Sequence, residues 1–463
     1  MRLPVRDGLL GVAALLAGCA GEPTAVPLRP VIETAAAVRN ERNVLSGILA
    51  VHARHADSVA VRYRIAGASA DSVTPTTALL GDSAAVPVLG LLPEQHYQLR
   101  AVAYGSGGTV IGDPIAFETG TLPSDLPHYA ASGDDPSPGY VVLAAGMYGL
   151  AIDNTGRVVW YHRFPNGPWL NFMAEPNGRY VARLVTIDPT DVESWIEVDA
   201  LGNTTRTFGC KNGLQPRFHD LVSEPNGGYW TLCDETRTMD LRASGGVANA
   251  KVTGQAIQHV SRTGELLFSW SPFDHFLITD VDSATRAGPS VNWTHGNSLD
   301  IDSDGNILVS FRNLSEITKI DSRTGAVLWR LGGRRNQFAL GNGIQIFAGQ
   351  HSVRALGGGQ LMLLDNVGDS LESRAERWEI NAQTGTAQLI DVHGAVPRVR
   401  TLIGGSVQAV SSDRTLVSFG TEGRVEEYDA HGAVKWRIDG APGYVFRAQR
   451  IRSLYQPGVN TAR

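Results

Sequence analysis

Concentrated positive charge is missing from this 463-residue chain, which has 40 lysine and arginine residues against 46 aspartate and glutamate residues. A nucleic-acid-binding protein needs a basic patch, so nucleic acid is not expected as a partner. The chain also lacks the adjacent-cysteine and metal-carboxylate motifs that are typical of quinone-dependent oxidoreductases. That class of enzyme is therefore disfavoured.

Long apolar runs are also missing. The run near the start, Leu9–Leu16, follows two arginines and is too short to span a bilayer, so residues 1–19 are predicted to be an export signal. It ends in Leu-Ala-Gly-Cys, which resembles a bacterial lipobox and predicts a lipid anchor at Cys19; the alternative is an ordinary signal peptide with a coincidental cysteine. Because Ala20 follows rather than Asp, the pattern favours the periplasmic side of the outer membrane or the cell surface. Residues 20–30 are expected to be a linker.

Cysteine is scarce as well, with three residues in all. After Cys19, only Cys210 and Cys233 remain. Export to an oxidising compartment permits a disulfide between them, and we favour that bridge over two unpaired buried thiols.

Glycine, in contrast, is abundant, with 52 residues, and helical periodicity is rare. The stretch Trp293–Arg330 shows the dominant pattern: short runs of alternating polarity that are separated by Gly, Asp and Asn. Such runs are typical of antiparallel strands joined by tight turns. The four runs are Asn297–Ile301, Ile307–Phe311, Glu316–Ile320 and Ala326–Arg330.

This pattern is repeated along the chain. A turn with glycine, followed by an apolar run that often ends in Trp, recurs every 46 to 62 residues, at Gly156, Gly202, Gly264, Gly325, Gly385 and Gly432. Repeats of this length with about four strands each predict a six-bladed β-propeller over residues 125–455, in which the first and last blades share strands. A pair of β-sandwiches fits so regular a period less well. Residues 456–463 are expected to be a C-terminal tail.

Residues 31–122 lack the repeat and contain strand patterns at Val59–Ile65, Tyr97–Ala103 and Ile115–Thr119. Leu91-Leu92-Pro93-Glu94-Gln95-His96-Tyr97 matches the Leu-x-Pro-x-x-x-Tyr signature of fibronectin type III domains, with Tyr97 as the tyrosine corner. The chain is therefore predicted to be all-β: a small fibronectin III/Ig-like β-sandwich followed by the propeller.

Histidines gather at one position of the repeat. Alignment of the repeats places three histidines among the five residues at the start of the innermost strands, although the whole chain has only 12. Arg312, after the second strand of one of these blades, is expected at the same channel mouth. The five aligned residues are Asn171, His219, His295, His351 and Ser406.

Two chemistries suit this set. Imidazoles are common zinc and copper ligands, but Arg312 would be repelled by a metal ion and no carboxylate or thiolate stands beside the histidines. Imidazole with guanidinium instead suits a tetrahedral oxyanion, which arginine binds through paired hydrogen bonds while one histidine attacks and another exchanges a proton. We favour the anion site; taken singly, each histidine could merely bind backbone carbonyls.

The residues around these histidines resemble the successive motifs of bacterial arylsulfate sulfotransferases. Further stretches agree, including WSPFDHF at 270–276, LLDNVG at 363–368, GSVQAVSSDRTLVSFG at 405–420 and YVFRAQR at 444–450. The motifs that carry the resemblance are Phe218-His219-Asp220, Trp293-Thr294-His295-Gly296-Asn297-Ser298-Leu299-Asp300, Ser310-Phe311-Arg312-Asn313-Leu314 and Gln350-His351.

The resemblance implies an exported, PAPS-independent enzyme that moves a sulfuryl group from a phenolic sulfate ester to a phenol by a ping-pong reaction, with no cofactor and no metal. It implies that His351 is the nucleophile that forms a sulfohistidine, that His295 and Arg312 hold the sulfate oxygens, and that His219 is the acid/base. The family often has a doubled histidine where this chain has Phe218-His219.

Two further expectations follow. Trp293, Phe218 and Tyr444 are candidates for an aromatic wall beside the phenol. The alternative function is a non-catalytic exported propeller that binds anionic or glycan ligands, which would tolerate Asn or Gln in place of His351.

Overall fold

The computed structural model describes residues 27–168, 171–184, 195–341, 343–439 and 443–458. The expected export signal, its Cys19, most of the linker and the end of the C-terminal tail lie outside the described residues. No helix within the described ranges has the length and apolar character needed to cross a membrane.

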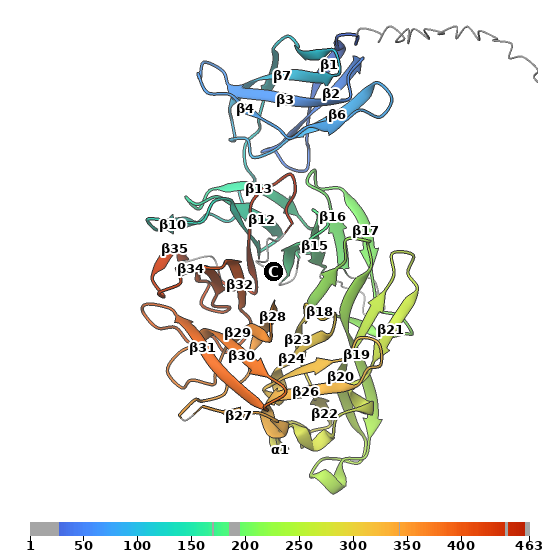
Figure 1. Cartoon of the computed structure of the whole chain (residues 1–463), viewed down its shortest axis with the longest axis vertical. Coiled ribbons are helices and arrows are strands. Elements are labelled where there is room, and N and C mark those ends of the chain that lie inside the picture. The colour runs from blue at the N-terminus through green and yellow to red at the C-terminus, as the bar shows by residue number, and fades with distance from the viewer. Residues whose placement is uncertain (1–26, 169–170, 185–194, 342, 440–442, 459–463) are drawn as a thin grey trace, which may run out of the picture.

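The N-terminal unit is built from strands β1 to β9, which within the described residues form two sheets, β1-β2-β6 and β4-β3-β7-β8, with β5 and β9 paired to the second (Figure 1). Their inward side chains, such as Leu49, Val61 and Leu99, are fully buried. The Leu92 N–H donates to the Tyr97 hydroxyl at 2.8 Å, the contact expected of a tyrosine corner. The strands are β1 (Val31–Arg39), β2 (Gly47–Arg54), β3 (Ser58–Ile65), β4 (Ser72–Val73), β5 (Thr77–Ala78), β6 (Ser83–Val88), β7 (His96–Gly105), β8 (Gly108–Ile111) and β9 (Ile115–Glu118).

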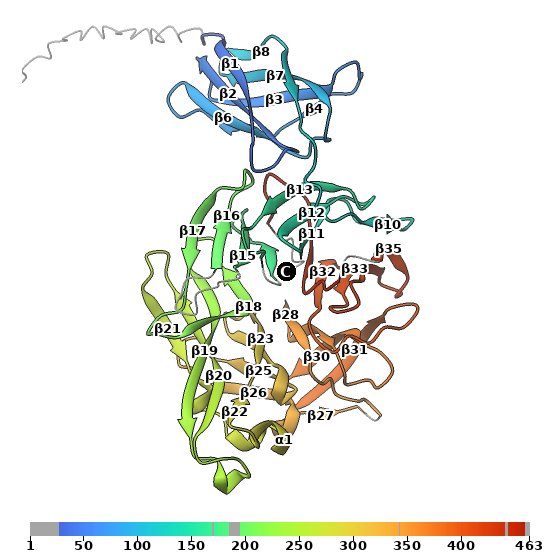
Figure 2. The same ribbon diagram turned by 180° about the vertical axis from the view of Figure 1, so that it is seen from behind.

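The predicted β-propeller is confirmed, because the strands after β9 form six sheets among the described residues, arranged around a central axis (Figures 1 and 2). From the innermost strand outward, the first three are β36 (Ala448–Ile451), β11 (Tyr140–Ala145), β12 (Tyr148–Ile152) and β13 (Val158–Arg163); β14 (Phe172–Ala174), β15 (Tyr180–Arg183), β16 (Trp195–Val198) and β17 (Thr204–Phe208); and β18 (Gln215–Ser223), β19 (Tyr229–Met239), β20 (Ala250–Val260) and β21 (Leu266–Trp270). The others are β23 (Gly296–Ile301), β24 (Ile307–Phe311), β25 (Glu316–Ile320) and β26 (Val327–Gly332); β28 (His351–Gly357), β29 (Gln360–Asp365), β30 (Arg374–Asn381) and β31 (Thr386–Gly394); and β32 (Ser406–Ser411), β33 (Arg414–Ser418), β34 (Val425–Asp429) and β35 (Val434–Asp439).

Both ends of the propeller segment close the ring. The C-terminal strand β36 pairs with β11 as the innermost strand of the first blade. At the outer edge of the last blade, β10 (Ala130–Ser132) pairs with β35. The first and last blades therefore share strands, as the repeat predicts, and the chain ends are joined through hydrogen bonds at both the inner and outer edges.

The repeated tryptophan explains why the sequence period is so regular. Trp160, Trp270 and Trp436 are buried on the outermost main strands of their blades. Each indole N–H donates to a backbone carbonyl in the glycine turn of the next blade, at Ala200 (2.8 Å), Gly325 (3.1 Å) and Asn154 (2.9 Å). The turn and the tryptophan of successive repeats thus form one contact between neighbouring blades.

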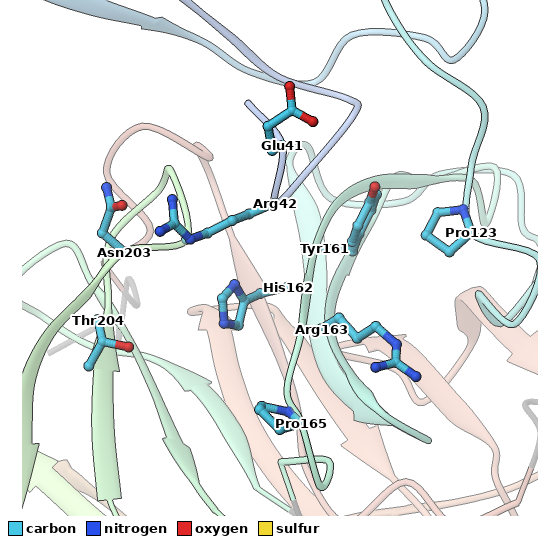
Figure 3. Close-up of a pocket in the computed structure, with 10 residues that line it drawn as sticks. Glu41, Arg42, Pro123, Tyr161, His162, Arg163, Pro165, Asn203 and Thr204 are labelled. Atoms are coloured by element: carbon cyan, nitrogen blue, oxygen red, sulfur yellow. The ribbon is translucent and has the colours of Figure 1, made fainter. Parts of the chain in front are cut away.

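The N-terminal unit is held against the first two blades by polar and apolar contacts. The Val44 N–H donates to the Tyr161 hydroxyl at 3.0 Å, and the Asn40 side chain donates to the Leu201 carbonyl at 3.0 Å. Leu45 is fully buried in the core of the first blade. A cavity of about 670 Å³ lies at this junction, and none of the predicted site histidines lines it (Figure 3).

Candidate active site

His351 begins β28, His295 directly precedes β23 and His219 lies in the middle of β18, and each is beside an irregularity in strand pairing. The register shifts between Pro216 and Leu221 around His219, between Gly296 and Ser298 after His295, and between His351 and Arg354. Such bulges redirect side chains away from the regular alternation of a strand. Two non-glycine residues here, His295 (φ 49°) and Ser352 (φ 59°), also have left-handed backbones, a costly conformation that is common at functional sites.

These irregular segments of the inner strands bring the predicted residues together. The rings of His219 and His295 have centroids 5.0 Å apart. The Phe446 ring packs against both His219, at 5.8 Å, and His351, at 6.3 Å. Arg312 begins a 3-10 turn (Arg312–Leu314). Its backbone N–H donates to the backbone carbonyl of His295 at 3.1 Å. All four residues therefore surround one mouth of the channel.

His351 is buried in a hydrogen-bond network that fixes its tautomer. Its Nδ1 lies 2.8 Å from the Asn366 Oδ1 and 3.2 Å from the Gly349 carbonyl oxygen; both oxygens only accept, so Nδ1 carries the proton. Nε2 therefore holds the lone pair and accepts the Gly404 N–H at 3.2 Å. Burial lowers the pKa of His351 to about 4, so the imidazole is neutral near pH 7. A neutral imidazole with a fixed lone pair is suited to nucleophilic attack.

His219 and His295 have the opposite tautomer. The Arg217 Nε–H donates to the Nδ1 of His219 at 3.0 Å, and the Asn292 amide Nδ2 lies 2.6 Å from the Nδ1 of His295. Both partners are donors, so both Nδ1 atoms accept and the protons lie on Nε2. Burial, reinforced by Arg217, lowers the pKa of both imidazoles far below the usual range, to about 2 for His295. Both rings are therefore neutral N–H donors.

Arg312 is a partly buried cation without a carboxylate partner among the described residues. Its Nη1 donates to the Asn313 side chain at 3.0 Å and its Nη2 to the Leu402 carbonyl at 3.2 Å, while its buried Nε has no hydrogen-bond partner. Burial lowers the pKa of Arg312, with Tyr444 acting in the opposite direction. A desolvated guanidinium beside neutral N–H donors favours an anion.

Below the histidines, a layer of ion pairs crosses the channel. Arg447 donates to Asp220 at 2.6 Å and Arg354 donates to the same carboxylate at 3.1 Å. Burial opposes ionisation of Asp220, but the two guanidinium groups outweigh it and its pKa is lowered. Arg447 also donates to the His219 carbonyl at 3.3 Å, so the layer supports the acid/base candidate from below. A separate cavity of about 480 Å³ lies beyond this layer.

One sequence prediction about the aromatic wall is wrong and another is supported. Trp293 packs against Phe273 and belongs to the hydrophobic core of the third and fourth blades, and not to the rings around His219 and His351. The side chain of Phe218 lies outside the described residues. Tyr444 does lie at the site: a Cβ added to Gly404 would be 2.1 Å from its hydroxyl oxygen.

The predicted disulfide between Cys210 and Cys233 is confirmed, with Cα atoms 6.1 Å apart. Cys233 lies on β19 and pairs with Pro216 of β18. The bridge therefore ties the segment that precedes β18 to β19, the neighbouring strand of the same blade. Arg217 and His219 both lie on β18. Within the described ranges, no group of three or more His, Cys, Asp or Glu side chains is placed to hold a metal ion.

Sequence reasoning missed the residues that orient the histidines. Asn366 lies inside the LLDNVG stretch and Arg217 directly precedes the Phe218-His219-Asp220 motif, but the sequence pattern assigns neither residue a role. The loop of Thr401–Gly405 was also missed, although it contacts both His351 and Arg312. The signal available in the sequence was the adjacency of Arg217 to the histidine motif.

Comparisons with solved structures give weak likenesses. A protein of unknown function from Bacteroides caccae has 13% identity and a TM-score of 0.45, covering 68% of this chain and 100% of that one. A streptogramin B lyase has 11% identity and a TM-score of 0.37 (67% and 87% covered), and a chain of a nidogen/laminin complex has 12% and 0.39 (67% and 97%).

Sequence comparisons give a clearer result. The search of curated proteins finds no match. The sequence profile of the arylsulfotransferase (ASST) family, however, matches residues 140–439, which is more than half of the chain. The matched segment contains His219, His295, Arg312 and His351. This chain therefore belongs to the arylsulfotransferase family and is a sulfotransferase enzyme.

Proposed function

We propose that this protein is a PAPS-independent arylsulfate sulfotransferase, which moves a sulfuryl group from a phenolic sulfate ester to a phenolic acceptor through a sulfohistidine at His351. The observation that carries the proposal is the pairing of a neutral His351, whose Nδ1 proton is held by Asn366, with the cation Arg312, which has no carboxylate partner among the residues that the structure describes. The first supplies a lone pair and the second attracts the sulfate oxygens.

In the first half-reaction, the Nε2 lone pair of His351 attacks sulfur while the bond from sulfur to the aryl oxygen breaks, and the phenolate leaves with the electron pair. Arg312 and His295 donate hydrogen bonds to the sulfuryl oxygens, and we assign His219 to the phenolic oxygen. In the second half-reaction, the acceptor oxygen attacks sulfur and the electron pair of the N–S bond returns to Nε2. The donor phenol leaves before the acceptor binds, which makes the reaction ping-pong.

We propose that the aryl group rests on Tyr444 and on the loop of Thr401–Gly405. Leu402 and Ile403 are 54% and 47% exposed on this loop, whose Leu402 carbonyl accepts from Arg312. Apolar side chains beside the anion-binding guanidinium suit a substrate with an aromatic ring and a sulfate group. The hydrogen bond from the Gly404 backbone N–H to the His351 Nε2 must break before sulfur can approach that nitrogen. The loop of Thr401–Gly405 is therefore expected to shift on substrate binding.

We further propose that Cys19 is lipidated, and that the protein is exported and tethered on the periplasmic side of the outer membrane or at the cell surface. The N-terminal sandwich is proposed to be a fibronectin III-like spacer. Its Leu92–Tyr97 hydrogen bond and two-sheet arrangement support this assignment. Labelling with a radioactive fatty acid in cells, comparing wild type with Cys19→Ala, tests the anchor; label on the variant would contradict it.

The test of function is release of 4-nitrophenol from 4-nitrophenyl sulfate, with and without phenol, by the wild type and His351→Asn. We expect release that depends on phenol and is lost in the variant. His393→Asn is the matched control, because His393 is also buried but stacks on Tyr428 in the fifth and sixth blades. A well-folded wild type that releases no nitrophenol with any of several phenols would contradict the proposal and favour a ligand-binding propeller.

A further inference from the structure

The side chain next to the histidine motif, Arg217, has a geometry that bears on the chemistry of His219. We infer that Arg217 is a positioning residue that holds His219 in its Nε2–H form, so that His219 serves the phenolic oxygen as a hydrogen-bond donor and does not take its proton. This inference rests on the proposed function and revises the acid/base role that the family resemblance implies.

The first step is the direction of the hydrogen bond. A guanidinium group has only donors, so the Nδ1 of His219, 3.0 Å from the Arg217 Nε, must accept. In a neutral imidazole the proton then lies on Nε2. A protonated His219 would place two N–H groups against each other, so the same contact also opposes the cation.

The second step is the rigidity of Arg217. Its Nη1 pairs with Asp234 at 3.3 Å, and the Gln255 amide donates to the other oxygen of that carboxylate at 2.8 Å. The Oε1 of Gln255 accepts the Thr294 hydroxyl and the Gly296 N–H, both at 2.7 Å. These two residues flank His295. The network therefore fixes the Arg217 fork relative to both histidines, and a flexible lysine could not reproduce it.

The third step is the chemistry that remains for His219. Burial and the neighbouring cation Arg217 lower its pKa far below the usual range, so the ring is neutral at working pH. The N–H of a neutral imidazole is a much weaker acid than a phenol. It can stabilise a phenolate by a hydrogen bond, but it does not transfer its proton. The acceptor must then attack as a phenolate that has given its proton to water.

Kinetics separate this donor role from a base role. With phenol as acceptor, the rate of desulfation should rise with pH toward the pKa of phenol, about 10, because the phenolate is the reacting form. A histidine base with a lowered pKa would already be unprotonated at every pH of this experiment. The rate of desulfation would then not change with pH.

Arg217→Gln and Arg217→Lys test the positioning role in the full-length protein. Each should lower kcat about tenfold or more with phenyl sulfate, whose phenolate needs the donor, and much less with 4-nitrophenyl sulfate. A purely structural role would lower both rates equally. Arg237→Gln, which removes an exposed arginine paired with Glu235 on the same blade, is the control and should leave both rates unchanged.

The tautomer can be read without activity by ¹⁵N NMR of histidine-labelled protein, with the His219 signals assigned by their loss in His219→Asn. We expect the Nε2–H form in wild type and a tautomer mixture in Arg217→Gln. An Nδ1–H form of His219 in an active wild type would overturn the inference about Arg217 but not the proposed function. Equal losses of kcat in the Arg217 variants with the two substrates would do the same. Absence of all sulfotransfer from the folded wild type would overturn the proposed function, and with it the catalytic role given to His219.

Discussion

Replacing Asn366 by leucine removes the contact that defines the nucleophile. Asn366 is fully buried, its Oδ1 lies 2.8 Å from the His351 Nδ1, and its Nδ2 donates to the carbonyls of Thr401 (3.1 Å) and Gly404 (2.9 Å). One amide thus fixes both the proton of the nucleophile and the loop above it. Leucine has nearly the same shape but no polar atoms.

The size of the effect follows from the charge that develops on His351. When Nε2 attacks sulfur, the ring becomes cationic, and its Nδ1–H bond to Asn366 changes from a neutral to a charge-assisted bond. Neutral bonds contribute about 0.5–1.5 kcal/mol and charged ones about 1.5–3 kcal/mol, so the transition state gains about 1–2 kcal/mol over the ground state. The sulfation step should therefore slow by about 5- to 30-fold in Asn366→Leu.

The assay is the burst of 4-nitrophenol from excess enzyme in the absence of an acceptor, which measures the first half-reaction alone. Asn40→Leu is the matched control: Asn40 is also buried and hydrogen-bonded, but it lies at the domain junction. It should unfold more easily and keep the wild-type burst rate. A burst in Asn366→Leu as fast as in wild type would refute the role given to the Nδ1 contact.

Asn366→Asp makes a second, opposite test of the same contact. A carboxylate still accepts the Nδ1 proton, but its charge favours the imidazolium form of His351 and should raise its pKa by about 1–3 units. The acid limb of the burst rate should therefore move to higher pH in this variant. An unchanged acid limb would show that position 366 does not control the protonation of His351.

Three further results are expected. The wild-type burst rate should be constant from pH 8 to about 5 and fall as pH drops through about 4, because burial lowers the pKa of His351 and protonation removes its lone pair; a limb near pH 6.5 would contradict this. Leu402→Ser with Ile403→Ser should raise KM for aryl sulfates with little change in the saturated burst rate, and an unchanged KM would place the aryl group elsewhere. Cys210→Ser opens a bridge with a sequence separation of 23 residues and should lower the free energy of unfolding by about 3 kcal/mol in urea titrations, whereas no loss would show that the bridge does not form.

The fold was largely predictable because its signals are local. The runs Ile307–Phe311 and Glu316–Ile320 predicted from alternation are the observed β24 and β25, and Gly305 and Gly325 take the positive φ angles that their turns need. Strand identity depends on neighbours within a few residues, so one sequence suffices. The ring closure was suggested only in outline, because β36 and β11 are separated by most of the propeller.

The site was predictable as a set of residue types and not as a set of contacts. Equivalent positions of a repeat meet at the channel, so the three histidines could be found without coordinates. The contact of Gly404 with His351 joins residues 53 apart in neighbouring blades, and no local pattern reports it. The prediction that Trp293 lines the site was wrong for a related reason. Trp293 packs against Phe273, and the motif around His295 does not reveal that contact.

Three chemically identical side chains at this site differ because of what binds their Nδ1 atoms. A carbonyl-type oxygen at His351 leaves the lone pair on Nε2, whereas donor groups at His219 and His295 leave N–H groups there. Sulfuryl transfer needs one nucleophile and several donors, so three equal tautomers would serve it poorly. The residues that determine this division of roles are Asn366, Arg217 and Asn292. Their exchange should change the chemistry of the site without removing any histidine.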